Sequence, residues 1–125
     1  MDHNMVGWFE IPVKDMERAK SFYDQVFKIA IQVQDFNGVL MGWFPYAEGK
    51  KGAPGSLIKH EAYIPSNSDG VLVYFSSHDV ENEINRVEEA GGKVLQSKTQ
   101  ISPDVGYMAL FIDSEGNRMA LHSRK

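Results

Sequence analysis

An internal repeat constrains the fold of this chain more than any other feature. When the sequence is shifted by 64 positions, with no gap, several residues of the first half meet identical residues in the second. The pairs include Asp15 and Asp79, Glu17 and Glu81, Gly42 and Gly106, Gly52 and Gly116, and Leu57 and Leu121. Because these identities fall at expected helix starts and turns, the 125 residues are expected to form two copies of one unit within a single domain, 1–125.

Each half reads as strand–helix–strand–strand–strand. Asp15 and Asp79 are suitable N-cap residues, because a short carboxylate accepts hydrogen bonds from the free N–H groups of a first helical turn. Apolar residues recur at helical spacing after each Asp, and Gly91 and Gly92 are expected to end the second helix. The expected strands are 8–13, 29–34, 39–45, 55–62, 72–77, 93–97, 106–113 and 118–122. The modules are therefore expected at about 5–63 and about 71–123, with a linker at about 64–70.

Composition excludes several classes of protein. The formal net charge is −4, and no cluster of Lys or Arg could follow a phosphate backbone, so no nucleic-acid partner is expected. The absence of cysteine excludes disulfides, thiolate metal sites and a cysteine nucleophile. No apolar run approaches the length of a membrane span and the first residues do not resemble a secretory signal, so we expect a cytoplasmic protein without a membrane partner.

Two stretches carry a resemblance to a known superfamily. "WFEIPVKDMERAKSFYDQVF" and "GYMALFIDSEGNRMALHS" resemble the opening and closing segments of the vicinal oxygen chelate superfamily, which includes glyoxalase I, bleomycin-resistance proteins and extradiol dioxygenases. The resemblance implies an α+β fold in which two tandem βαβββ modules form a curled mixed sheet around a cleft. It also implies a homodimer, in which a two-fold partner covers open sheet edges and apolar cleft rims.

The resemblance also identifies four positions that hold metal ligands in the metal-dependent members. Carried over to this chain, they are Trp8, Ser56, Leu72 and Ala120. Divalent metals at such sites need imidazole or carboxylate donors, and a single Ser hydroxyl does not hold them. We therefore expect no metal at these four positions and no cofactor.

Strand alternation predicts which other side chains share the cleft with Trp8. If Trp8 points into the cleft, apolar residues such as Phe9 and Ile11 point toward the helices. Their apolar character supports this assignment of inward and outward side chains. Glu10 is then either an anchor for a ligand or a partner for a neighbouring polar side chain. The predicted lining consists of Trp8, Glu10, Ser56, Ile58, His60, Leu72, Tyr74, Ala120 and His122.

Three functional hypotheses follow from this lining. In the first, a metal-free binding protein holds a small molecule in the cleft, where apolar walls carry a few orienting polar groups. In the second, a glyoxalase-like or dioxygenase-like enzyme (a lyase, isomerase or oxygenase) uses Glu10 and His122 for acid–base catalysis, or binds a metal through displaced ligands such as Glu10, His60 and His122. In the third, the chain is a structural or regulatory module without a ligand. The first is the preferred prediction.

Overall fold

The structure is a computed structural model that describes residues 2–125, in which the chain forms two helices and eight strands. Their bounds are β1 Phe9–Pro12, α1 Met16–Phe27, β2 Gln32–Phe36, β3 Val39–Trp43, β4 Gly55–Lys59, β5 Tyr74–Ser76, α2 Val80–Val87, β6 Lys93–Ser102, β7 Gly106–Ile112 and β8 Arg118–Ser123. No helix within residues 2–125 is long and apolar enough to cross a membrane.

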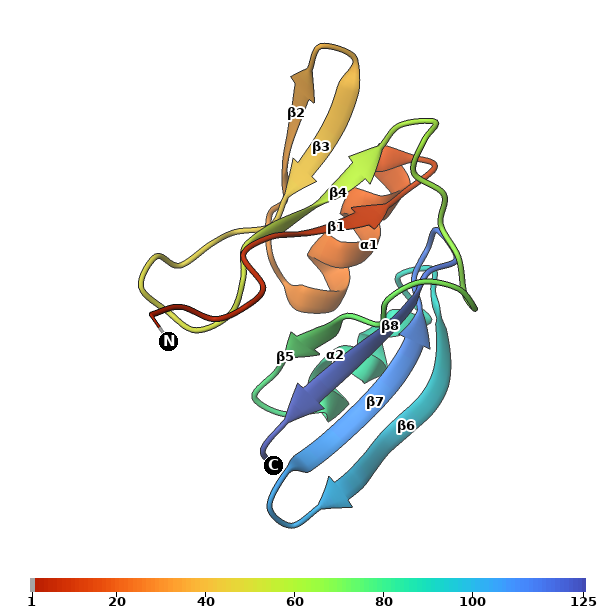
Figure 1. Cartoon of the computed structure of the whole chain (residues 1–125). Helices are drawn as coiled ribbons and strands as arrows, with labels where there is room; N and C mark the ends of the chain where they lie inside the picture. Colours follow the sequence, from red (N-terminus) through yellow and green to blue (C-terminus); the bar gives the residue numbers. More distant parts are fainter. Residues whose placement is uncertain (1) are drawn as a thin grey trace.

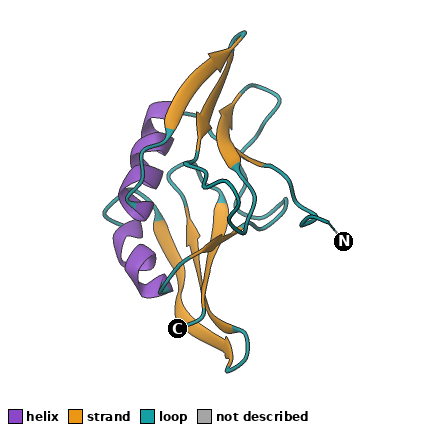
Figure 2. Ribbon diagram, turned by 90° about the vertical axis from the view of Figure 1, so that its left-hand side faces the viewer, coloured by secondary structure: helices purple, strands orange, loops and turns teal. Residues whose placement is uncertain are grey.

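The strands form two mixed four-stranded sheets, one from each half of the chain (Figure 1). The strand orders are β1-β4-β3-β2 and β5-β8-β7-β6, so the two sheets have the same topology. In each sheet the first strand pairs in parallel with the last, and the remaining pairs are antiparallel. Figure 2 shows both helices as a layer on one side of the strands. The predicted α+β class and the two βαβββ modules are confirmed; the curl of the sheets around one cleft stays a prediction.

Both helices begin where the sequence predicts. The Asp15 carboxylate accepts a hydrogen bond from the Arg18 N–H at 3.0 Å, and the Asp79 carboxylate accepts one from the Glu81 N–H at 3.0 Å. Helix α1 ends at Phe27, and the C-cap residue Lys28 adopts the left-handed conformation with φ of 56°. Helix α2 ends earlier than predicted, at Val87, because the chain continues in turns before it reaches the glycines.

Several strand bounds differ from the predicted ones. Strand β2 starts at Gln32 rather than at residue 29, because Ile31 is buried in the core and its N–H donates to the Asp24 carboxylate. Strand β6 extends to Ser102 rather than to residue 97, since its polar residues continue to pair with β7 through three register shifts. Strand β5 is shorter than predicted and covers only Tyr74–Ser76.

One face of each sheet packs against the helices. A Cβ atom added to Gly42 would lie 3.1 Å from the Met16 sulfur of α1, so the Gly42 position of β3 faces α1. Leu57, its partner on β4, is fully buried on the same side. Because side chains alternate along a strand, Trp43 and Ser56 lie on the opposite face, away from α1.

Aromatic side chains join the two modules. The ring of Phe75 on β5 packs against four rings of the first module, at centroid distances from 4.7 to 6.2 Å. These rings belong to Phe9, Tyr23, Phe27 and Phe44. The two modules therefore share one hydrophobic core, although each has its own sheet.

Candidate functional site

A cleft of about 910 Å³ lies between the two modules. Its walls come from β1, the loop after β3, the segment between the modules and β5. Four of the predicted site residues lie along this cleft, namely Trp8, Glu10, Leu72 and Tyr74. The glycine-rich loop contributes Lys51 and its neighbours to one wall. The cleft thus brings together the first strands of both repeats.

An aromatic row lies on the face of the first sheet that points away from α1. Ser56 pairs in register with Glu10 of β1 on one side and with Trp43 of β3 on the other, so the three side chains share a face. Trp8 lies two residues before Glu10, and its ring meets the Trp43 ring edge-on, with centroids 5.6 Å apart. The Phe36 ring of β2 stacks on Trp43 at 6.0 Å.

Ser56 is buried beneath this row without a hydrogen bond. Its exposed fraction is 0%, whereas Trp8 and Trp43 are each 39% exposed. Among the buried side-chain nitrogen and oxygen atoms of residues 2–125, the Ser56 Oγ is the one that has no partner. The Trp8 Nε1 donates to the Glu10 carboxylate over 3.4 Å, which is a long hydrogen bond. The row therefore lies on the same face as a buried polar atom that no group within residues 2–125 satisfies.

The four positions that the superfamily resemblance identifies as metal-ligand positions do not carry a set of metal donors in this chain. Trp8 and Leu72 line the cleft, whereas Ser56 and Ala120 are fully buried on β4 and β8. One hydroxyl among indole, aliphatic and methyl side chains does not suit a divalent cation. Within residues 2–125, no group of three His, Asp or Glu side chains is placed to hold a metal ion.

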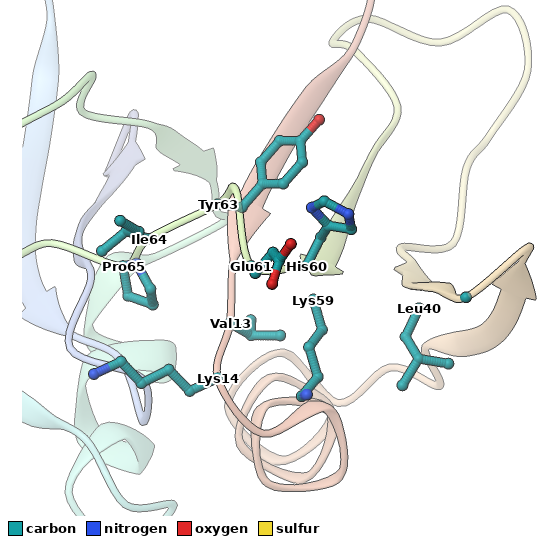
Figure 3. A pocket seen from close by; sticks show the side chains of 10 residues that line it. Val13, Lys14, Leu40, Lys59, His60, Glu61, Tyr63, Ile64 and Pro65 are labelled. Carbon is teal, nitrogen blue, oxygen red and sulfur yellow. The ribbon is translucent and has the colours of Figure 1, made fainter.

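His60 lies at a separate hollow of about 540 Å³ (Figure 3). It follows β4, its Nδ1 accepts a hydrogen bond from the Ala62 N–H at 3.1 Å, and its ring meets the Tyr63 ring edge-on. Lys14 and Lys59 also line this hollow, but their side chains point in different directions (Figure 3). Ile58, the strand residue two positions earlier, is 3% exposed and lines neither hollow.

His122 lies on the second sheet, apart from Glu10 on the first. It pairs in register with Ser76 and Met108, and its Nε2 donates to the Val105 carbonyl oxygen at 2.7 Å. Among the hydrogen bonds of residues 2–125, none joins Glu10 to His122. The predicted pairing of the two as catalytic acid and base stays a prediction.

The turn between β7 and β8 has a structural role that sequence reasoning missed. Asp113 is 3% exposed and accepts hydrogen bonds from the Tyr23 hydroxyl at 2.6 Å and from the backbone N–H groups of Glu115 and Asn117. Asn117 also donates to the Pro12 carbonyl oxygen at the end of β1. Burial raises the pKa of Asp113, and burial together with the Asp113 charge raises the pKa of Tyr23 well above its usual value. Tyr23 therefore remains a protonated donor.

Glu115 fastens the same turn to the junction between β1 and α1. Its carboxylate accepts the backbone N–H groups of Lys14 and Asp15, each at 2.8 Å, and pairs with Arg18 at 2.7 Å. Burial acts to raise the pKa of Glu115, but the hydrogen bonds from Arg18, Asp15 and Lys14 outweigh it and lower that pKa to about 2. The signal available in the sequence was the acidic turn "DSEGN", whose partners lie about a hundred residues earlier.

The sequence of this chain matches the model of a known protein family. Residues 5–121 match the model of the Glyoxalase/Bleomycin resistance protein/Dioxygenase superfamily, and the chain belongs to this superfamily. The predicted resemblance to the vicinal oxygen chelate superfamily is thereby confirmed.

Individual relatives and solved structures match nearly all of this chain. A "Glyoxylase-like domain-containing protein" from Didymella fabae is 28% identical over an alignment of 127 positions, which covers 98% of this chain and 95% of the relative. A glyoxalase I mutant from Zea mays superposes with a TM-score of 0.72 at 20% identity over 94% of this chain, which spans only 46% of the maize protein. TnmS3, an antibiotic binding protein from Streptomyces sp. CB03234, superposes with a TM-score of 0.67 at 24% identity and covers 100% of this chain and 99% of its own.

Proposed function

We propose that this protein is a metal-free small-molecule-binding member of its superfamily, and that the ligand lies in the cleft between β1 and β5. The observation that carries the proposal is the lining of that cleft. Both modules contribute to this lining. Two of the four positions that the resemblance identifies as metal-ligand positions line the cleft, and they hold Trp8 and Leu72. A hollow with apolar walls and a few polar groups is the usual form of a small-molecule site.

The structural neighbours support a binding role. TnmS3 is described as an antibiotic binding protein, and it matches this chain over nearly the full length of both. Because their sequences are only 24% identical, the likeness shows a shared fold, and the ligand of this chain has to be identified by experiment.

A thermal-shift screen of aromatic and polar small molecules tests the proposal. A ligand that binds only the folded state raises the melting temperature, so at least one class of compound is expected to do so. Tyr74→Ala, which removes a half-exposed ring from the cleft wall, is expected to reduce the shift. Leu95→Ala, an exposed apolar position on β6 outside the cleft walls, serves as the matched control.

Metal analysis of the purified protein is a second test of the proposal. The proposal predicts less than stoichiometric zinc, iron, nickel or manganese in the purified protein. Stoichiometric metal that is lost on Glu10→Gln would overturn it, as would a complete compound panel that leaves the melting temperature unchanged.

A homodimer is the assembly that the first sheet favours. Strand β2 is exposed along all five residues, and it forms the outer edge of its sheet in the projecting β2–β3 hairpin (Figure 1). An open edge with exposed apolar groups such as Phe36 and Val33 suits a two-fold partner. Sedimentation is expected to give twice the chain mass of 14.1 kDa, with Phe36→Glu shifting the population to monomer. A monomeric wild-type protein at micromolar concentration would contradict the assembly.

A further inference from the structure

The unpartnered hydroxyl of Ser56 indicates a missing hydrogen-bonding group. Buried polar groups in folded proteins nearly always have a partner, because losing water without replacing it costs about 1–3 kcal/mol. Ser56 Oγ is buried and has no partner within residues 2–125, although Ser56 lies on the sheet face directed away from the helix layer. A ligand that enters above this face would supply the partner.

Two indole rings lie on the same sheet face as Ser56, and both tryptophans are partly exposed. The Trp8 and Trp43 rings meet edge-on across β4, and each residue is 39% exposed. Trp8 has one long hydrogen bond, to Glu10, and it lies before β1 rather than within the strand. Trp8 also belongs to the wall of the cleft between the modules. A movement of Trp8 away from Trp43 would therefore open the sheet face toward the cleft.

The polar groups beside the rings, the exposed Glu10 and the buried Ser56, define a type of ligand. Glu10 is the direct neighbour of Ser56 across β1 and β4, and the oxygens of its side chain accept hydrogen bonds. The Ser56 hydroxyl can accept one as well, so the two residues together suit an N–H or O–H donor. The rings of Trp8, Trp43 and Phe36 offer flat apolar surfaces, on which an aromatic molecule stacks well.

We infer that the Trp8–Trp43 pair opens to admit a flat aromatic ligand bearing a phenolic O–H or an aromatic N–H, and that Ser56 and Glu10 together hold this donor group. The inference rests on the proposed small-molecule function and specifies the ligand class of that site. It assigns Ser56 to the recognition of a hydrogen-bond donor on the ligand, at one of the four positions that the superfamily resemblance identifies as metal-ligand positions.

The chain offers a selective reporter for this site. It contains two tryptophans, Trp8 and Trp43, and both belong to the pair. Their indole N–H signals in nitrogen–proton NMR spectra therefore report on the site alone, and Trp43→Phe assigns them. Suitable probes are 2-naphthol, which carries a donor, and 2-methoxynaphthalene, which has the same ring system without one.

Titration with the two probes tests the inference. Both probes are expected to shift the two indole signals, and 2-naphthol is expected to bind about threefold to tenfold more tightly, which is the range for one hydrogen bond. Ser56→Ala is expected to bring the ratio of the two affinities close to one, and Glu10→Ala to lower it as well. Ser97→Ala, an exposed serine on β6, is the matched control and is expected to keep the wild-type ratio.

The outcomes separate this inference from the proposed function. Equal affinities in the wild type, or a wild-type ratio retained in both Ser56→Ala and Glu10→Ala, would overturn the inference. Unmoved indole signals, together with compounds from the thermal-shift panel that still bind, would also overturn it and leave the proposed function intact. If no compound of either set binds, the proposed function fails as well.

Discussion

A single side chain on β4 shows how a residue can be placed for a purpose other than stability. Ser56 is as deeply buried as its neighbour Leu57, yet its hydroxyl has no hydrogen-bond partner in residues 2–125. An alanine at this position would fill nearly the same space without the polar atom. The presence of serine therefore has a cost in the unliganded protein, consistent with a role in recognition.

Ser56→Ala is expected to leave the free energy of unfolding unchanged or to raise it by up to about 1 kcal/mol, because it removes an unsatisfied buried hydroxyl. Chemical denaturation without ligand measures this change. Ser123→Ala is the contrasting variant, since the buried Ser123 Oγ accepts a hydrogen bond from the Val80 N–H. A loss of stability in Ser56→Ala as large as in Ser123→Ala would show that Ser56 has a structural partner.

At the scale of elements, the sequence pattern predicts helices better than strands. The caps at Asp15 and Asp79 depend on neighbouring residues, so both helix starts could be read from local chemistry. The bounds of β2 and β6 depend on partner strands that periodicity does not describe. Alternation along the strands likewise put Glu10 and Ser56 among the cleft residues. Trp43 was missed because its place beside Ser56 depends on the order of the strands, in which β3 is the neighbour of β4.

Helix α1 ends with a conformation that its residue type does not favour. Lys28 has φ of 56°, a region that glycine adopts without steric cost. Lys28→Gly is therefore expected to raise the free energy of unfolding by about 0.5 kcal/mol, the relief of strain exceeding the added flexibility of the unfolded chain. Thermal unfolding compares it with Lys28→Ala, which keeps the Cβ atom. A Lys28→Gly protein no more stable than Lys28→Ala would contradict the expected relief of strain.

For the whole molecule, one aromatic side chain and one turn are prominent among the contacts that join the two modules. Phe75 of the second module packs among rings of the first, and Phe75→Ala is expected to lower the free energy of unfolding by about 3 kcal/mol. The neighbouring Tyr74→Ala removes a ring that is 50% exposed and is expected to cost much less. If urea denaturation gave equal losses of stability for Phe75→Ala and Tyr74→Ala, Phe75 would not be a residue that joins the modules.

Glu115 makes stability depend on acid pH. Its pKa of about 2 lies below the ordinary value of 4.5, so its contribution is complete above about pH 4.5 and is lost as the pH falls toward 2. Glu115→Gln is expected to lower the free energy of unfolding at pH 7 by about 2 kcal/mol, because hydrogen bonds to a charged group are lost.

The difference between Glu115→Gln and the wild type should shrink below pH 4.5, which denaturation across pH 2 to 7 would measure. Glu89→Gln, at an exposed position, is the control. A difference that is constant over this pH range would rule out the charge of Glu115 as its source.

The contact between Glu115 and Lys14 also bears on how the chain is made. The two residues are 101 positions apart, so a ribosome must synthesise the closing turn of the second repeat before the first helix receives its anchoring carboxylate. The first repeat, although its own strands and helix are made earlier, therefore reaches its final form only after that turn has been synthesised.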